Sequence, residues 1–324
     1  MTQHTEEPDL TNGRGLQSIR EGFYKFVFFA FAALTVVTTI AIILTLLVDA
    51  VTFFAQYSPV AFLTGTDWSP ALKPVSFGVL PLVFGTLVVT VTAAFIAIPV
   101  GTLTAVYLSE YAAEGTRQVL KPLLEILAGV PTVIYGFFAL VYITPVIDVF
   151  FPSVTTFNVL SASLMVGIMT IPMVSSISED AMAAVPDSLR QAGYGLGATK
   201  YDVTTGVVVP AATSGIVSSY ILAISRAIGE TMIVTVAMGM QAKLPVVGST
   251  EVFGFGVPFV HPGTVFLESG QTMTAAMVQI AQSDLAGGTT AYNSLFAIGL
   301  TLFVITLLMN IVSNVISERY REEY

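Results

Sequence analysis

The chain has 324 residues, of which 54% are hydrophobic and only 10% are charged, and its mean hydropathy is +0.82. Because soluble domains carry about a quarter charged residues, this composition predicts an integral membrane protein. The formal net charge of −9 argues against a basic surface for nucleic acid. The sequence contains no cysteine, which excludes disulfide and thiol chemistry.

Six apolar runs are each long enough to cross a bilayer, which takes about 20 helical residues. The sequence therefore predicts an all-α protein with six transmembrane helices, embedded in the cell membrane. A polar cytoplasmic tail of residues 1–22 precedes this six-span domain of residues 23–316, and residues 317–324 form a second tail. The predicted spans are Phe26–Phe54, Leu80–Leu108, Leu123–Phe150, Val159–Met182, Ile216–Gly239 and Ser294–Ile316.

Lysine and arginine predict which way the spans are oriented. With the N-terminus inside, the outer segments hold only Lys73 and Lys243. The positive-inside rule therefore places both termini in the cytoplasm. The inner segments hold nine basic residues: Arg14, Arg20, Lys25, Arg117, Lys121, Arg190, Lys200, Arg319 and Arg321.

Two outer loops carry recognisable features. The first, residues 55–79, contains Trp68, which we expect to anchor the protein at the membrane interface. The second, residues 240–293, is long and contains a segment, Gln271–Ser283, with apolar residues on one helical face. That pattern predicts either an amphipathic or re-entrant helix over the outer mouth, or an ordinary loop helix packed on the spans. The apolar face consists of Met273, Met277, Ile280 and Ala281.

The third predicted span contains two prolines, Pro131 and Pro145, which are expected to kink it. Gly129 and Gly136 should loosen the same helix further. Such a helix can bend during gating, although many proline kinks are static.

Arg226 and Glu230 lie four residues apart in the fifth predicted span. A charge near the bilayer centre costs a few kcal/mol or more, so charges kept there usually have a function. At i and i+4 the two side chains are predicted to share one helix face, where they can pair. They predict either a buried ion pair that locks helix packing or a polar station on a path through the membrane. A fixed cation there would suit an anionic solute.

The inner segment of residues 183–210 is too polar to span the membrane and predicts a helix–glycine–helix unit. Pro186 is expected to start the first helix, with Asp187 placing negative charge at its N-terminus. Gly197 should end that helix. A second short helix is predicted to begin near Thr199.

This segment resembles the cytoplasmic signature of membrane subunits of binding-protein-dependent ABC importers. That signature reads Glu-Ala-Ala, three residues, Gly, nine residues, then Ile-x-Leu-Pro. The chain has Gln191, Ala192 and Gly193, then Gly197, with the same spacing. Gln191 lacks the charge of the family's Glu. The closing positions are Val207, Val208, Val209 and Pro210.

Further segments resemble the phosphate-specific importer permeases of the PstC type, over about residues 23–316. The loop ending in Trp68 and the Thr231–Met232 pair favour this type over its sister permease. The segments that carry the resemblance are Phe62–Trp68, Phe77–Pro81, Tyr107–Tyr111, Ala128–Phe138 and Arg226–Met232.

The resemblance implies a type I ABC importer permease fold, in which residues 183–206 form the coupling helix that docks on an ATPase. It implies a second homologous permease subunit, an ATPase dimer that binds ATP and Mg, and an extracytoplasmic phosphate-binding protein. The chain has no Gly-x-x-x-x-Gly-Lys-Ser/Thr motif, so we expect a non-catalytic subunit without a cofactor of its own. Two alternatives stay open: a permease for another oxyanion, such as sulfate or molybdate, and a non-transporting membrane scaffold for an ATPase.

Overall fold

The computed structural model describes residues 14–71, 73–245, 247–252 and 255–319; the predicted tail segments 1–13 and 320–324 lie outside these ranges. The described chain is helical apart from two small antiparallel hairpins, as the composition predicts. Among the described helices, five are long and apolar enough to cross a membrane, and the count reaches six if the bent pair Lys200–Ala211 and Thr213–Ile228 is taken as one span. Six predicted spans therefore correspond to six spanning segments.

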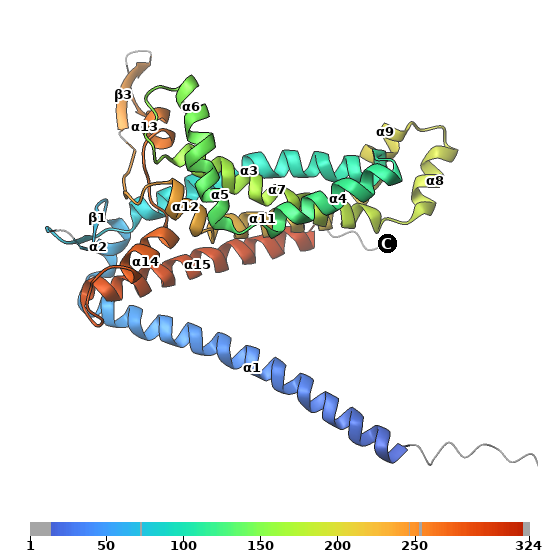
Figure 1. The fold of residues 1–324 in the computed structure, drawn as a ribbon, viewed down its shortest axis with the longest axis horizontal. Coiled ribbons are helices and arrows are strands. Elements are labelled where there is room, and N and C mark those ends of the chain that lie inside the picture. Colours follow the sequence, from blue (N-terminus) through green and yellow to red (C-terminus); the bar gives the residue numbers. More distant parts are fainter. Residues whose placement is uncertain (1–13, 72, 246, 253–254, 320–324) are drawn as a thin grey trace, which may run out of the picture.

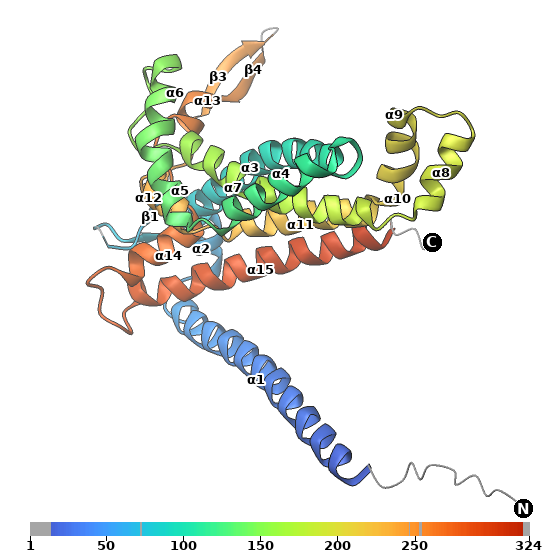
Figure 2. The ribbon, with the colours of Figure 1, turned by 45° about the vertical axis from the view of Figure 1, so that its right-hand side comes forward.

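The first and last spans lie side by side only at the outer end of the molecule (Figure 1). Helix α1 (Arg14–Phe54) begins within the segment predicted to be a polar tail, far from the bundle, and reaches the bundle only at its C-terminal end (Figure 2). Its apolar side chains are exposed along most of its length, as suits a helix in contact with lipid or another subunit. Helix α15 (Thr290–Arg319) packs along the bundle itself.

The centre of the bundle is formed by α3 (Leu80–Val106) and α7 (Val159–Ala183). Their backbones approach closely where glycine replaces a side chain. A Cβ on Gly101 would lie 2.6 Å from the Cβ of Val174, and one on Gly167 would lie 3.1 Å from the Cβ of Ile96. Small residues permit this approach, which drives helix packing in membranes through van der Waals contact.

The third span starts later than predicted. Helix α4 (Glu114–Gly129) has no buried residue and is a separate helix at the inner end. Val130 and Pro131 then adopt extended backbone conformations, because a residue before proline avoids the helical region. The span itself consists of α5 (Thr132–Phe138), the π-helical turn η2 (Ala139–Ile143) and α6 (Thr144–Phe150).

The fifth span is also interrupted, which the sequence analysis did not predict. Helix α11 (Thr213–Ile228) ends at Gly229, and α12 (Met232–Ala237) starts three residues further on. Before α11, the segment Lys200–Ala211 is bent by 68° relative to it. The single predicted helix Ile216–Gly239 is therefore wrong in its continuity, although the chain follows the same route.

The inner end carries a projecting unit, seen at the right of Figure 1, that stands clear of the spans. It follows α7 and leads back into α11, in the region predicted to be cytoplasmic. Its elements are α8 (Asp187–Gly195), α9 (Lys200–Val203), η3 (Thr204–Val208) and α10 (Val209–Ala211), and η1 (Tyr107–Tyr111) lies next to it at the end of α3.

The outer end is built from the two predicted loops. Trp68 is buried there against Phe77, so its expected role as an interfacial anchor is wrong: the loop folds inward over an aromatic cluster. The loop of residues 240–293 forms a hairpin and two helices. The outer elements are α2 (Pro59–Thr64), β1 (Trp68–Ser69), β2 (Ser76–Phe77), β3 (Val247–Val252), β4 (Phe255–Val260), α13 (Pro262–Phe266) and α14 (Met273–Ala281).

An ionic cluster fastens α4 to α7. The carboxylate of Glu179, whose side chain is only 1% exposed, accepts hydrogen bonds from Arg117 and from Lys121 Nζ at 2.6 Å. Lys121 also donates to Asp180 Oδ1 at 3.0 Å. The hydrogen bond to Glu179 is the main reason why the pKa of Lys121 lies above its ordinary value. This stabilisation is therefore complete at neutral pH and is lost only as the pH rises above that ordinary value.

We expect Glu179→Gln to lower the stability of the assembled complex by about 1–2 kcal/mol, because two cations would face a neutral amide. Asp180→Asn is the matched control: its carboxylate is 65% exposed and pairs with Lys121 at the surface, so its loss should cost less than about 0.5 kcal/mol. Thermal unfolding of the two variants in lipid nanodiscs measures the difference. Equal melting temperatures would show that the Glu179 cluster does not hold α4.

Candidate functional site

The first candidate site lies at the interruption of the fifth span. Arg226 is in the last turn of α11, and Glu230 follows the end of that helix. Arg226 Nη2 lies 3.9 Å from Glu230 Oε2, so the predicted pairing is confirmed. The predicted shared helix face is wrong, because the helix has already ended. The two side chains also differ in exposure: 46% for Arg226 and 3% for Glu230.

Glu230 holds the break together. Its Oε1 accepts hydrogen bonds from the backbone N–H of Met232 at 3.0 Å and of Ile233 at 3.1 Å. These are first-turn donors of α12, which have no partner within the helix and favour negative charge beside them. The carboxylate thus satisfies the start of α12 while its second oxygen faces Arg226.

Helix α14 also reaches this break, which the sequence analysis missed. The hydroxyl of Thr274 donates to the backbone carbonyl of Glu230 at 2.7 Å and lies 2.9 Å from the Thr272 hydroxyl. Thr272 caps α14 by accepting from Ala275 N–H at 3.2 Å. The cap by Thr272 is predictable from a threonine before an apolar run, but the bond from Thr274 to a residue 44 positions away is not.

The start of α14 is also bonded to the centre of the bundle. Met273 N–H donates to the Thr86 hydroxyl of α3 at 3.0 Å, and both residues are buried. The Gln271 carbonyl packs so closely on Gly85 that a Cβ there would lie 2.2 Å away. The first turn of this segment is therefore buried in the bundle, and the helix packs on the spans, as both alternatives for it require.

The second candidate site is the projecting inner unit, where the predicted helix–glycine–helix is confirmed. Gly197 has a φ of +82°, which an L side chain rarely adopts. Thr199 and Asp202 then form a capping box that starts α9. Leu196 between the helices is 90% exposed, so this unit presents an uncovered apolar side chain at its tip.

The residues of the predicted signature all belong to this unit. Gln191 and Ala192 are exposed on α8, and Pro210 is exposed on α10. Gly193 faces α9, where a Cβ would lie 2.9 Å from Val203 Cγ2. Pro186 precedes the helix as its N-cap and does not occupy the first helical position. Gly193 therefore brings the two helices together, while Gln191 and Ala192 stay available on the surface of α8.

Arg190 connects the unit to the spans, a role that the sequence analysis did not assign. Its guanidinium donates to Glu110 Oε1 at 3.1 Å and to the Met182 carbonyl at 2.8 Å, and its side chain is only 15% exposed. A third bond reaches the Val185 carbonyl at 2.5 Å. One buried cation thus joins α8 to the ends of α7 and of the α3–η1 helix.

Comparison with known proteins agrees with this architecture. The family of binding-protein-dependent transport system inner membrane components matches residues 97–322. The chain is 31% identical to the probable ABC transporter permease protein YqgH of Bacillus subtilis, over 96% of this chain and 95% of the relative. It is 31% identical to the phosphate transport system permease protein PstC of Mesorhizobium japonicum, over 77% and 75%. The chain in a solved bacterial alginate ABC transporter, in complex with an alginate-bound periplasmic protein, has a TM-score of 0.61 at 12% identity, over 94% of this chain and 98% of that one.

The fold and its two sites define a multi-pass membrane permease subunit of an ABC importer. The chain belongs to the family of binding-protein-dependent transport system inner membrane components, and the PstC resemblance predicted from its motifs is confirmed. The solved structure supports the type I importer fold alone, since the sequence identity is low.

We expect Thr274→Val to loosen the break, since it keeps the side-chain volume but leaves the buried Glu230 carbonyl without its donor, at about 1–3 kcal/mol. Hydrogen exchange of the Met232 and Ile233 amides should accelerate in the assembled complex, and ATP-dependent uptake should fall. Thr274→Ser retains the hydroxyl and is the control. Identical exchange in the two variants would contradict a positioning role for Thr274.

Proposed function

We propose that this chain is a membrane-spanning subunit of a phosphate importer and forms half of the translocation path. The PstC-like segments and the relatives named as phosphate transport permeases support this substrate. The observation that carries the proposal is the half-exposed guanidinium of Arg226, placed midway along the fifth span.

Two observations support a transport role for Arg226 over a purely structural ion pair. Glu230 already accepts hydrogen bonds from two backbone N–H groups, and the distance of 3.9 Å between Arg226 Nη2 and Glu230 Oε2 makes their ion pair a weak one. A half-exposed cation at this depth cannot face hydrocarbon without a large cost. We infer that this face lines an aqueous path covered by a second, homologous permease subunit.

Phosphate fits such a station. A guanidinium presents a planar fork of donors that matches phosphate oxygens, and it stays charged at any physiological pH. The nearby Glu230 carboxylate offsets the positive charge, which favours the weak binding that transport requires. Solute therefore would be held briefly rather than trapped.

We further propose that the projecting inner unit is the coupling helix for a partner ATPase dimer, which binds ATP and Mg and performs the hydrolysis. The exposed surface of α8 and its apolar tip at Leu196 suit a docking groove. Because Arg190 ties α8 to α7 and to the end of α3, displacement of α8 by the ATPase would move the central helices. Two packed arrangements of such a bundle can alternate access to the path.

An extracytoplasmic phosphate-binding protein is the proposed source of the solute. The solved alginate importer was captured with a periplasmic protein, and the present chain shares its fold. The permease itself performs no chemistry in this proposal.

We expect Arg226→Ala to reduce phosphate uptake by at least about 100-fold while insertion and assembly persist, because the path would lose its cation. The measurement is uptake of labelled phosphate, sulfate and molybdate into vesicles that hold all subunits. Lys73→Ala, which removes an exposed outer cation, is the control and should retain transport. Phosphate uptake near the wild-type rate in Arg226→Ala would reject the site. In the wild-type complex, uptake of sulfate or molybdate alone would reject the proposed substrate, and uptake of none of the three anions would favour the scaffold alternative.

We expect Gly197→Ala to uncouple ATP hydrolysis from uptake, because its φ of +82° costs an L residue about 1 kcal/mol or more. Gly195→Ala is the matched control: this glycine ends α8 with ordinary helical geometry, and no atom lies within 4 Å of the added Cβ. The rates of ATP hydrolysis and of phosphate uptake are measured in the same reconstituted complexes. Normal coupling in Gly197→Ala would show that the glycine hinge is not required.

A further inference from the structure

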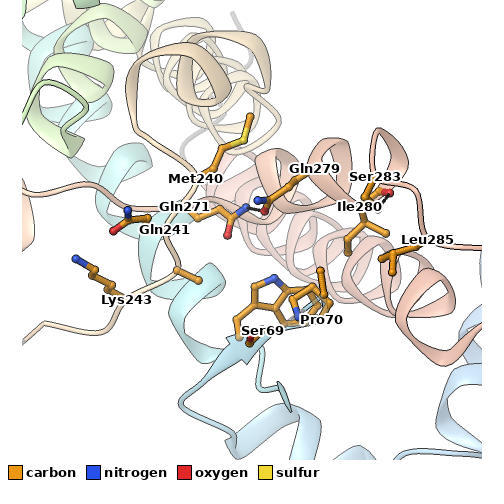
Figure 3. A pocket seen from close by; sticks show the side chains of 13 residues that line it. Ser69, Pro70, Met240, Gln241, Lys243, Gln271, Gln279, Ile280, Ser283 and Leu285 are labelled. Carbon is orange, nitrogen blue, oxygen red and sulfur yellow. Dashed lines mark hydrogen bonds between the residues drawn. The ribbon is translucent and has the colours of Figure 1, made fainter. Parts of the chain in front are cut away.

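The outer end of the bundle contains a cavity of about 350 Å³, which we call the outer pocket. In Figure 3 the side chains of Gln271 and Gln279 meet along one wall, and Ser69 and Pro70 lie opposite. The two amides are joined by a bond of 2.6 Å from Gln271 Nε2 to Gln279 Oε1. The pocket therefore has a fixed polar wall within a largely apolar lining that includes Trp68 and Ile280.

Trp68 brings an unusual group to this pocket. Its side chain packs in the aromatic cluster and is only 9% exposed. The indole Nε1–H is buried and has no hydrogen-bond partner within the part of the chain that the structure describes. A buried donor left unpaired costs about 1–3 kcal/mol, so an acceptor that enters the pocket and meets this N–H would recover that free energy.

An adjoining cavity of about 370 Å³, the acidic pocket, indicates the charge of the occupant. It shares Lys243 with the outer pocket and adds Asp67 and Glu268. Lys243 Nζ lies 3.6 Å from Glu268 Oε2, which leaves one carboxylate in excess. This balance disfavours a free anion and favours a basic side chain.

We propose that these two pockets receive one segment of the extracytoplasmic binding protein. A backbone carbonyl of that segment would accept from Trp68 Nε1–H, and a neighbouring lysine or arginine would enter the acidic pocket. The proposal rests on the importer function proposed above and names the place where its delivery protein docks. The negative charge there also means that free anion is not collected from solution at this point.

The outer pocket bears directly on the transport site through α14. Gln279 and Ile280 belong to the second half of this helix, while Thr274 in its first turn is bonded to Glu230. The helix has nine residues and is therefore about 13 Å long. A segment seated in the pocket would thus press on the same short, rigid element that holds the break beside Arg226.

The test uses the assembled importer in nanodiscs with its binding protein. A photo-crosslinker at Ala71 or Ser283, which line the outer pocket, should capture the binding protein. The same probe at Ser153, an exposed position in the turn between α6 and α7, should capture it at least about tenfold less. Trp68→Phe should raise the binding-protein concentration for half-maximal ATPase stimulation by about three- to tenfold, as expected for one lost hydrogen bond.

Two charge variants test whether the docking segment is basic. Glu268→Gln should weaken stimulation by the binding protein, and Lys243→Gln should strengthen it, because a basic segment is attracted by the excess carboxylate. The opposite pair of effects would overturn the proposal in favour of an anionic occupant. Both side chains are about half exposed, so neither variant threatens folding as Trp68→Phe does.

A further experiment tests whether inorganic phosphate alone binds in the outer pocket. Trp68 is the only tryptophan of the chain, so its fluorescence in the purified full chain reports on the outer pocket. A response to millimolar phosphate would contradict docking of a protein segment. Loss of crosslinking with normal phosphate uptake would reject the pocket alone, whereas normal crosslinking without phosphate uptake would reject only the proposed substrate.

Discussion

A broken helix inside a membrane must satisfy its own backbone, and the candidate site at Arg226 depends on how this chain meets that constraint. No water is available in hydrocarbon to receive the free N–H and C=O groups of an interrupted helix. Here the Glu230 carboxylate accepts the first donors of α12, and the Thr274 hydroxyl donates to the Glu230 carbonyl. The interruption is thereby stable, and it leaves Arg226 at the end of α11 with its guanidinium uncovered on one side.

The break between α11 and α12 also connects helices that are far apart in sequence. Through Met273 and Thr86, the first turn of α14 is fastened to α3, the helix that also packs along α7. At the inner end, Arg190 fastens the projecting inner unit to the ends of α7 and of α3–η1. Both ends of the molecule therefore act on one closely packed helix pair, and motion at either end has a short structural route to the centre.

The sequence predicted best where neighbouring residues decide the conformation. Gly197 follows the end of α8 because glycine adopts a positive φ without strain. Thr199 starts α9 through a capping box with Asp202, three residues further on. The predicted pairing of Arg226 with Glu230 was confirmed even though the helix between them ends. The break at Val130–Pro131 was placed in the right segment but read as a kink, because sequence alone does not tell a bent helix from two helices.

By itself, the sequence determined the membrane class, the number of spans, the family signature of the projecting inner unit and the charged pair in the fifth span, because hydropathy, short caps and residue spacing are local properties. Tertiary structure alone decided that Trp68 is buried, that α14 enters the bundle and that Arg190 and Glu179 are anchored on other helices. These outcomes depend on contacts between residues tens to hundreds of positions apart. Their partners are chosen by how the helices pack, which the order of residues along any one helix does not contain.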